Sequence, residues 1–399
     1  MIIIYIIIML KNIKILQIIS TLNPRSGGPQ AGIIESSNRL SSSNISVDIL
    51  TSDNKNYLKD KKIKFKIIKL NIKPRSYNFS FKLIKWINKN KKKYDFFIIH
   101  GLWEFNSLLA RLFIKKNYYI IPHGQLDPYF SNNTFKRIKK QIYWNLIEKK
   151  NIINSNGILV SGENEKLMLK NTFVNTTKIN IVDIGYANQI QKIKFKKINY
   201  KKIFEKKFPD LKNKKFILFI GRIHHKKGCD ILLEAIKEIK DLKGYKFLIA
   251  GFSEKLSFYE KKIIQMISSH ETLKNNITVS NFLTENIKVA SLKFSDATIL
   301  PSRGENFGVS VSESISISKI PLITSKVGIY EYIKKYKAGL VCDANKNSIY
   351  KMIYKYINLN QKQKNLYKKN SLKCFNEIFN IKNKNNKLIK LLYNDFKKD

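Results

Sequence analysis

Two short segments of this chain carry residue types that bind phosphates and sugars. In the first, Phe216–Gly228, an apolar run ends at a glycine and is followed by Arg222 and Lys227. A guanidinium binds phosphate oxygens through paired N–H donors, and a lysine ammonium adds a mobile point charge. Two such cations can stabilise a departing diphosphate, whose charge grows as a glycosidic bond breaks. A solvated lysine-rich turn is the structural alternative. Lys226 fits that alternative, whereas Arg222 argues against it because the chain has only seven arginines.

The second segment, Pro301–Glu313, carries two glutamates eight positions apart, Glu305 and Glu313. Gly308 lets the backbone approach a ligand closely, and the amides at the start of the helix expected over 309–319 could meet a phosphate. Eight helical residues span about 12 Å, so one carboxylate could contact a transferred sugar and the other a ribose diol. The alternative is a glutamate that only complements the helix dipole, with Glu313 exposed. Together the two segments predict a pocket for a nucleotide-activated sugar.

Loops after expected strands in the first half of the chain carry further candidates. Gly27 and Gly28 could bind a phosphate or the acceptor through backbone N–H groups. His123 could bind the sugar or a phosphate oxygen, and it would need a pKa near neutrality to accept a proton. His100 and Asp127 are candidates for acceptor contact. The alternatives are an ordinary loop, structural histidines and a helix cap at Asp127.

Short apolar runs alternate with helical segments along the chain. This alternation predicts parallel sheets with helices on both faces, and these elements must position the candidate residues. In the first half, strands are expected at residues 15–20, 47–51, 65–70, 96–100, 118–121 and 157–160, and helices at 31–40, 81–88 and 135–150. In the second half, strands are expected at 216–220, 246–250, 277–280, 297–300, 322–324 and 339–341, and helices at 229–241, 309–319, 348–358 and 361–379. Ligands of such sheets bind at the carboxyl ends of the strands, and we expect the site in a cleft between two domains.

The domain boundary is predicted from a change in amino-acid composition. The lysine-rich stretch Gln191–Lys215 has no clear period and is interpreted as a linker plus the entry to a second domain. We expect an acceptor-binding domain over 1–195 and a nucleotide-sugar-binding domain over 196–379, with a C-terminal helix at 380–399 that packs back on the first. Residues 1–10 are too few to span a bilayer and no cleavage site follows them. An upstream start, an unstructured extension and a weak membrane anchor are the alternatives for that segment.

Composition limits the classes of function. A chain of 399 residues with 43% hydrophobic residues can build two cores. The formal net charge of +46 would suit nucleic acid, but 68 of the 75 basic residues are lysines spread along the chain beside abundant Ile and Asn. This mixture indicates a coding bias, so we predict no nucleic-acid partner and assign the charge to anionic lipid or diphosphate substrates. The three cysteines form no CxxC pair, which fits a reducing compartment, and the five histidines form no HExxH motif, so no metal site is predicted.

The helix expected over residues 135–150 combines many lysines with aromatic residues. Basic amphipathic helices of this kind lie on anionic membrane surfaces. The alternative is a helix packed through Tyr143 and Leu146 with a solvated basic side.

The motifs GRIHHKKG, ENFGVSVSE and SGGP resemble those of retaining glycosyltransferases of family 4 with the GT-B fold, and the resemblance extends from about Lys14 to Phe379. HGLW and HGQLDP are similar to the branch that acts in bacterial surface-polysaccharide assembly. The resemblance implies two Rossmann-like domains, no metal and no cofactor besides the nucleotide-sugar donor. Two positions depart from the pattern: His225 stands where relatives often have proline, and Arg303-Gly304 replaces a more usual polar pair, which leaves the sugar preference open.

The resemblance also implies roles for individual residues. Arg222 and Lys227 would bind the donor diphosphate, Glu305 the donor sugar and Glu313 the ribose. Three neighbouring residues would give backbone contacts to the sugar and the phosphates: Asn306, Phe307 and Gly308. The remaining roles fall in the first domain, where Gly28 would border the phosphates and His123 would face the reacting sugar.

The expected activity is transfer of a hexose from a nucleoside-diphosphate sugar to a saccharide or polyprenyl-linked glycan, with retention of configuration. The catalytic set would be His123, Arg222, Lys227 and Glu305. The expected location is the cytoplasm, with peripheral contact to the inner membrane through helix 135–150. Two alternatives stay open: another GT-B enzyme such as a sugar-nucleotide epimerase, and a basic non-catalytic protein that binds nucleic acid or membranes.

Overall fold

The computed structural model describes residues 12–23, 29–43, 45–58, 62–72, 77–126, 134–162, 165, 166, 169, 180–184 and 198–397. These residues divide into two compact units. The first contains the described residues up to 184 together with the C-terminal helix from Ile381, and the second contains residues 198–380. The predicted boundary at residue 195 lies outside the described residues.

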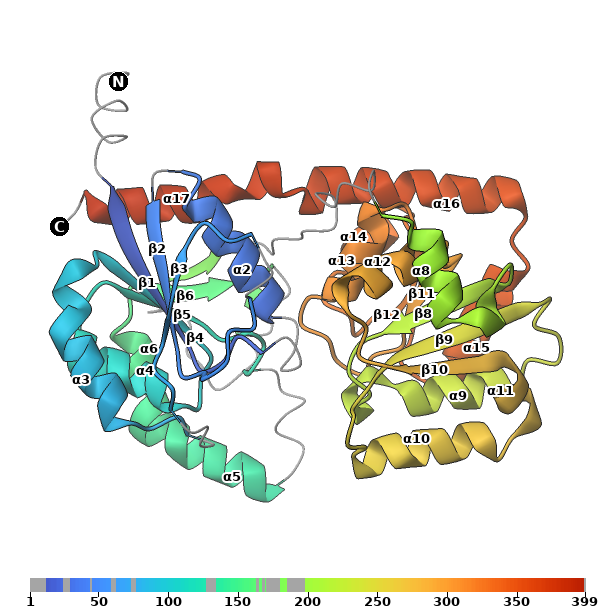
Figure 1. Cartoon of the computed structure of the whole chain (residues 1–399), viewed down its shortest axis with the longest axis horizontal. Coiled ribbons are helices and arrows are strands. Elements are labelled where there is room, and N and C mark those ends of the chain that lie inside the picture. The colour runs from blue at the N-terminus through green and yellow to red at the C-terminus, as the bar shows by residue number, and fades with distance from the viewer. Residues whose placement is uncertain are drawn as a thin grey trace. The chain divides into compact units, whose positions relative to one another are not determined.

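The first unit is built on a parallel sheet (Figure 1) with the strand order β3-β2-β1-β4-β5-β6-β7. Its strands are β1 (Ile13–Ile19), β2 (Ile45–Thr51), β3 (Lys66–Lys69), β4 (Phe96–His100), β5 (Tyr118–Ile121), β6 (Gly157–Val160) and β7 (Ile181–Asp183). Its helices are α2 (Pro29–Leu40), α3 (Phe81–Asn90), α4 (Phe105–Leu109), α5 (Thr134–Tyr143), α6 (Lys149–Ile153) and α17 (Ile381–Phe396). The bounds of β4, β5 and β6 are as predicted, whereas the three-residue strand β7 was not predicted because it is too short to show a period.

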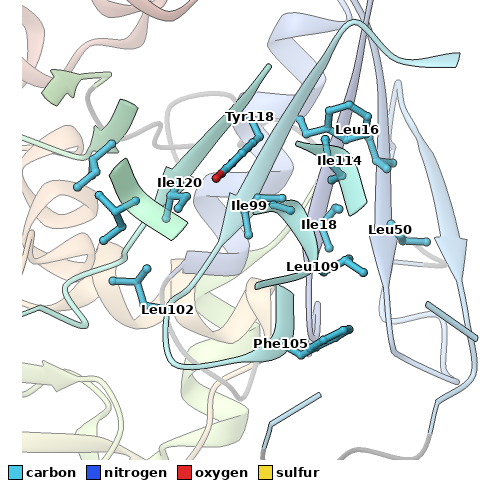
Figure 2. Close-up of a cluster of buried hydrophobic side chains, with 14 of the residues drawn as sticks. Leu16, Ile18, Leu50, Ile99, Leu102, Phe105, Leu109, Ile114, Tyr118 and Ile120 are labelled. Atoms are coloured by element: carbon cyan, nitrogen blue, oxygen red, sulfur yellow. The ribbon is translucent and has the colours of Figure 1, made fainter. Parts of the chain in front are cut away.

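Alternate residues of the central strands feed two cores, one on each face of this sheet. Leu16, Ile99 and Ile120 point into one core, as Figure 2 shows, where α3, α4 and α6 cover the sheet. Residues adjacent to these along the same strands pack on the other face with α2 and with Leu388 and Leu392 of α17. Both faces are therefore apolar, which is why the strands read as continuous hydrophobic runs in the sequence.

The second unit has its own parallel sheet, with the order β10-β9-β8-β11-β12-β13. Its strands are β8 (Lys215–Ile220), β9 (Tyr245–Phe252), β10 (Ile277–Asn281), β11 (Ala297–Leu300), β12 (Ile320–Thr324) and β13 (Leu340–Cys342). Its helices are α8 (Tyr200–Lys207), α9 (Cys229–Lys237), α10 (Phe258–Ser268), α11 (Glu271–Asn276), α12 (Glu285–Phe294), α13 (Val309–Ser316), α14 (Tyr330–Lys335), α15 (Lys346–Ile357) and α16 (Gln361–Cys374). In order of appearance its strands run third, second, first, fourth, fifth, sixth, which is the dinucleotide-binding arrangement.

The lysine-rich stretch Gln191–Lys215 was interpreted as having no clear period, yet it contains helix α8, which belongs to the second unit. Tyr200, Phe204 and Phe208 recur every four residues and are all buried. The ring of Phe204 stacks on Phe216 at the start of β8, with 5.2 Å between the ring centroids. The intervening lysines hide this spacing in the sequence, but three aromatic anchors are enough to fold the helix onto the sheet.

Candidate active site

The loops that carry Lys227 and Glu305 leave the second sheet side by side. β8 and β11 are parallel neighbours at the point where the strand order reverses, so both loops emerge at the same edge. Gly228 lets them touch: its φ is 71°, and a Cβ atom there would overlap the carbonyl oxygen of Pro301. Any other residue at position 228 would push the two loops apart.

Lys227 and Glu305 form an ion pair at this edge. Their side chains are 20% and 18% exposed, so both remain within reach of a ligand. Burial, together with the positive charges of Arg222 and Lys226, lowers the pKa of Lys227. The negative charge of the Glu305 carboxylate opposes this decrease in the pKa of Lys227, because it stabilises the ammonium form. An anionic group that bound here would favour the charged lysine in the same way.

The backbone of Glu305 is fixed by the loop that follows β12. Its N–H donates to the carbonyl of Lys326 at 2.9 Å, and its carbonyl accepts from Gly328 at 2.8 Å. A Cβ atom on Gly328 would overlap the carbonyl oxygen of Asn306, so this loop also depends on glycine for its close approach. The Glu305 carboxylate is therefore held in place from a third strand.

Arg222 directly follows the end of β8, and its side chain is exposed. Within the described ranges, no residue forms a hydrogen bond or ion pair with its guanidinium. The positive charge of Arg222 repels that of Lys227 and contributes to the lowered pKa of Lys227. Both cations therefore lie on the segment that follows β8 in the second unit.

Arg303 holds the loop that carries Lys227 through hydrogen bonds. Its guanidinium donates to both carboxylate oxygens of Asp230 at 2.7 Å and to the carbonyl of His225 at 2.8 Å. Tyr259 donates to the same aspartate at 2.8 Å. Although burial acts to raise it, the pKa of Asp230 is lowered by the hydrogen bonds from Arg303 and Tyr259. The Arg303 guanidinium thereby fixes the backbone of His225.

We expect Arg303→Lys to raise the KM for the donor about tenfold, because an ammonium cannot replace the forked contacts that hold the loop. The loss of about 1–2 kcal/mol of stability should accompany it. Steady-state kinetics and thermal melting measure the two effects. Lys346→Ala, which removes a more exposed ion pair with Glu238 at 3.2 Å, is the control and should change neither. An unchanged KM in Arg303→Lys would contradict the positioning role.

Glu313 lies in α13 and is 7% exposed. The alternative interpretation, in which Glu313 is an exposed helix residue, is therefore wrong. Its carboxylate accepts from Lys288 of α12 at 2.5 Å. Sequence reasoning missed Lys288, because nothing distinguishes it from the other lysines before the fold brings α12 and α13 together. The ribose contact predicted for Glu313 would have to share its carboxylate with this lysine.

The residues between the two glutamates differ in what they can offer. Gly308 adopts a φ of 88° at the start of α13. The ring of Phe307 is buried against Phe379 at 5.7 Å, so only its backbone could reach a ligand. Asn306 Oδ1 is buried without a hydrogen-bond partner among the described residues, and a buried acceptor of this kind usually needs a donor.

In the first unit, His100 ends β4, His123 lies two residues after β5, and the two side chains contact each other. Nδ1 of His100 lies 3.0 Å from Nε2 of His123, and Nε2 of His100 lies 2.8 Å from Gln17 Oε1. His100 is buried, so both of its ring nitrogens are taken before an acceptor could reach them. Burial lowers the pKa of His123 to about 4, so it does not meet the condition of a near-neutral proton acceptor. The other first-domain candidates, Gly28 and Asp127, lie outside the described residues.

A second polar cluster at the same edge of the first sheet was not predicted. Ser20, which follows β1, donates to Glu104, and Asn106 donates to Ser20 at 3.0 Å. Burial raises the pKa of Glu104. The available signal was the position of Glu104 two residues after the His100-Gly101-Leu102 sequence. A surface hollow of about 780 Å³ lies instead at the amino ends of β1 and β2, on the opposite edge, and includes none of the candidate residues.

Within the described ranges, no helix combines the length and the apolar character needed to cross a bilayer. In the same residues, no group of three or more His, Cys, Asp or Glu side chains is placed to hold a metal ion.

Comparison with known proteins identifies sequences and structures that are similar to this chain. Residues 201–373 match the family model for glycosyl transferases group 1. A sucrose-phosphate synthase from Thermosynechococcus elongatus superimposes with a TM-score of 0.76 at 14% identity, over 97% of this chain and 100% of that one. An Anabaena protein, HepE, solved with UDP and glucose, gives 0.74 at 14% identity, over 96% and 100%. The fold is therefore that of the GT-B glycosyltransferases, as predicted.

The sequence relatives match only part of the chain. A 2-deoxystreptamine N-acetyl-D-glucosaminyltransferase from Niallia circulans is 29% identical over 120 residues, which are 30% of this chain and 29% of that protein. The chain spans about a third of the length of the curated relatives it matches. The second unit thus carries the family resemblance, and the activity of the whole chain is taken up below.

Proposed function

We propose that this chain is a retaining glycosyltransferase that moves a hexose from a nucleoside-diphosphate sugar to a saccharide or lipid-linked acceptor in cell-surface polysaccharide synthesis. The observation that carries the proposal is the contact between Lys227 and Glu305, beside Arg222, at the reversal point of a dinucleotide-binding sheet. The match of residues 201–373 to glycosyl transferases group 1 supports it. Further support comes from structural neighbours described with UDP and glucose.

The chemistry requires charge stabilisation more than proton transfer by the protein. In the proposed step the bond from the anomeric carbon to the diphosphate oxygen breaks, and the acceptor hydroxyl oxygen bonds to that carbon on the same face. The hydroxyl proton passes to a phosphate oxygen, and the transition state resembles an oxocarbenium ion. Arg222 and Lys227 would stabilise the departing diphosphate. Glu305 would hold hydroxyls of the transferred sugar, and Glu313 those of the ribose.

A panel of sugar nucleotides tests the proposal. We expect one nucleoside diphosphate and its sugar to raise the melting temperature, because a ligand that binds only the folded state stabilises it. Incubation with that donor and candidate acceptors should yield free nucleoside diphosphate and a longer glycan of retained configuration. An isomerised sugar nucleotide would identify an epimerase instead. DNA binding with steep salt dependence and no response to nucleoside diphosphates would favour the non-catalytic alternative.

A membrane-facing surface is part of this proposal, together with a cytoplasmic location. Ile138, Ile142 and Leu146 recur every four residues along α5 and the turn after it, and they are 53%, 55% and 64% exposed. The aromatic residues predicted for this face turn inward instead: Trp144 is 2% exposed and Tyr143 is hydrogen-bonded to Tyr77 at 2.7 Å. Leu146 therefore does not pack the helix, contrary to the structural alternative.

Lysines accompany this apolar stripe. Lys139, Lys149 and Lys150 are exposed on the same helical segment. An exposed aliphatic stripe beside lysines is the pattern by which a helix lies on an anionic bilayer, with apolar side chains at the acyl boundary and ammonium groups at the headgroups. We therefore assign this surface to contact with the acidic lipid of the membrane.

Leu146→Asp is expected to lower binding to vesicles that contain phosphatidylglycerol about tenfold, because burial of a leucine side chain is lost and a negative charge is added. Co-sedimentation measures the bound fraction. Leu366→Asp is the matched control, since Leu366 on α16 is 59% exposed but belongs to another surface. Equal binding by the two variants, or binding of wild type to neutral vesicles alone, would refute the assignment.

A further inference from the structure

A chain of hydrogen bonds runs from helix α2 through β1 to His123. The hydroxyl of Ser37 donates to the carbonyl oxygen of Ile33 at 2.7 Å, and the amide nitrogen of Gln17 donates to Ser37 Oγ at 2.8 Å. His100 then joins Gln17 Oε1 to the ring of His123, at 2.8 Å and 3.0 Å. Ser37, Gln17 and His100 are 0%, 1% and 3% exposed, so bulk water cannot replace any of these links.

The direction of every hydrogen bond in this chain follows from its first member. A carbonyl oxygen only accepts, so the single hydroxyl hydrogen of Ser37 is used on Ile33, and Ser37 Oγ accepts from Gln17. Gln17 therefore presents its carbonyl oxygen to His100, whose Nε2 must carry a hydrogen. In a neutral His100 the other nitrogen, Nδ1, then accepts the Nε2–H of His123. His123 is left with an unprotonated Nδ1.

The surroundings favour neutral rings. A second hydrogen on His100 would meet the Nε2–H of His123, so the contact would persist only if His123 moved its own hydrogen to Nδ1. Burial lowers the pKa of both histidines, and the proximity of His123 lowers that of His100 further. Among the described residues, none is hydrogen-bonded to Nδ1 of His123. His123 lies two residues after β5 and has a φ of 50°.

We propose that Gln17 and Ser37 are positioning residues that fix His123, through His100, as the tautomer with its hydrogen on Nε2 and its Nδ1 free to accept. An accepting nitrogen can take the hydrogen of a sugar hydroxyl, but it cannot bind a phosphate oxygen, which has no hydrogen to give. Of the two contacts predicted for His123, this assigns the hydroxyl. That consequence rests on the proposed function, whereas the tautomer itself does not.

Nitrogen NMR of the full chain with ¹⁵N-labelled histidine tests the tautomer directly, since protonated and unprotonated ring nitrogens have well-separated shifts. The spectrum of His123→Gln assigns the resonances. In the wild type we expect a protonated Nε2 and an unprotonated Nδ1 at His123. Ser37→Ala and Gln17→Met should each give a mixture of tautomers. Ser36→Ala is the matched control, because Ser36 also donates to the Ile33 carbonyl, at 3.0 Å, but has no contact with Gln17.

A wild-type His123 with its hydrogen on Nδ1 would overturn the proposal, and so would an unchanged single tautomer in both Ser37→Ala and Gln17→Met. Kinetics supply the second readout: Gln17→Met should lower kcat about fivefold with little change in the KM for the donor, while Ser36→Ala leaves both unchanged. If the spectra are as expected but no sugar nucleotide is turned over, the tautomer assignment stands and the proposed function fails.

Discussion

Replacement of Lys227 by alanine is expected to lower turnover by about a hundredfold or more, because it removes one of two cations that would stabilise the departing diphosphate. The change also leaves Glu305 without its ion-pair partner, so a negative charge would stand where the phosphates bind. Binding of the nucleoside diphosphate should weaken as well. Steady-state kinetics give the loss of turnover, and the shift in melting temperature with the nucleoside diphosphate gives the loss of binding.

The control for Lys227→Ala is Lys237→Ala in the neighbouring helix α9. Lys237 also forms an ion pair with a glutamate, Glu234, at 3.0 Å, but on the surface of the helix. Its loss should change neither turnover nor nucleotide binding. Lys227→Met, which keeps the apolar part of the side chain, separates the charge from packing. Near-normal turnover in Lys227→Ala would remove the site assignment, whatever the effect on stability.

The sequence predicts the fold well because both sheets are buried on two faces. Strands such as β4 and β6 are apolar runs bounded by glycine or polar residues, so their bounds are visible without the structure. The proximity of Lys227 and Glu305 could also be anticipated. Each follows a strand of a doubly wound sheet, and the loops at a reversal point meet at one edge.

Contacts between side chains of distant segments could not be predicted. Arg303 reaches Asp230 and Lys288 reaches Glu313 only after several helices have packed, and neither pair has a spacing that a single sequence reveals. Among 68 lysines, the type of residue alone carries no information about Lys288. Arg303 departs from the resembling sequences, but its contact with Asp230 follows only from the folded arrangement of the two loops.

Gln17 is a different case, because the sequence did contain a signal. It interrupts the buried run Ile13–Ile19 with an amide, and a buried amide needs hydrogen-bond partners. Those partners, Ser37 and His100, come from α2 and the end of β4, so only the fold could name them. A polar residue in an otherwise apolar strand therefore indicates a network before its members are known.

Glu305→Ala is expected to lower turnover by about a hundredfold while binding of the nucleoside diphosphate is retained or strengthened. The carboxylate would hold hydroxyls of the transferred sugar, so its loss affects the reacting group and leaves the contacts to the diphosphate intact. Without Glu305 the ammonium of Lys227 has no competing anion, which favours the phosphates. Both variants should lose turnover, but they should differ in nucleotide binding. Lys227→Ala should weaken it, whereas Glu305→Ala should not.

Glu305→Gln refines the Glu305 experiment, because an amide can still accept from a hydroxyl but carries no charge. Its turnover should lie between those of wild type and Glu305→Ala. Glu234→Gln, the acidic partner in the surface pair of α9, is the matched control and should behave as wild type. If Glu305→Ala loses nucleotide binding together with turnover, the carboxylate serves to hold the Lys227 loop and not the sugar. That result would separate the two roles that its contact with Lys227 allows.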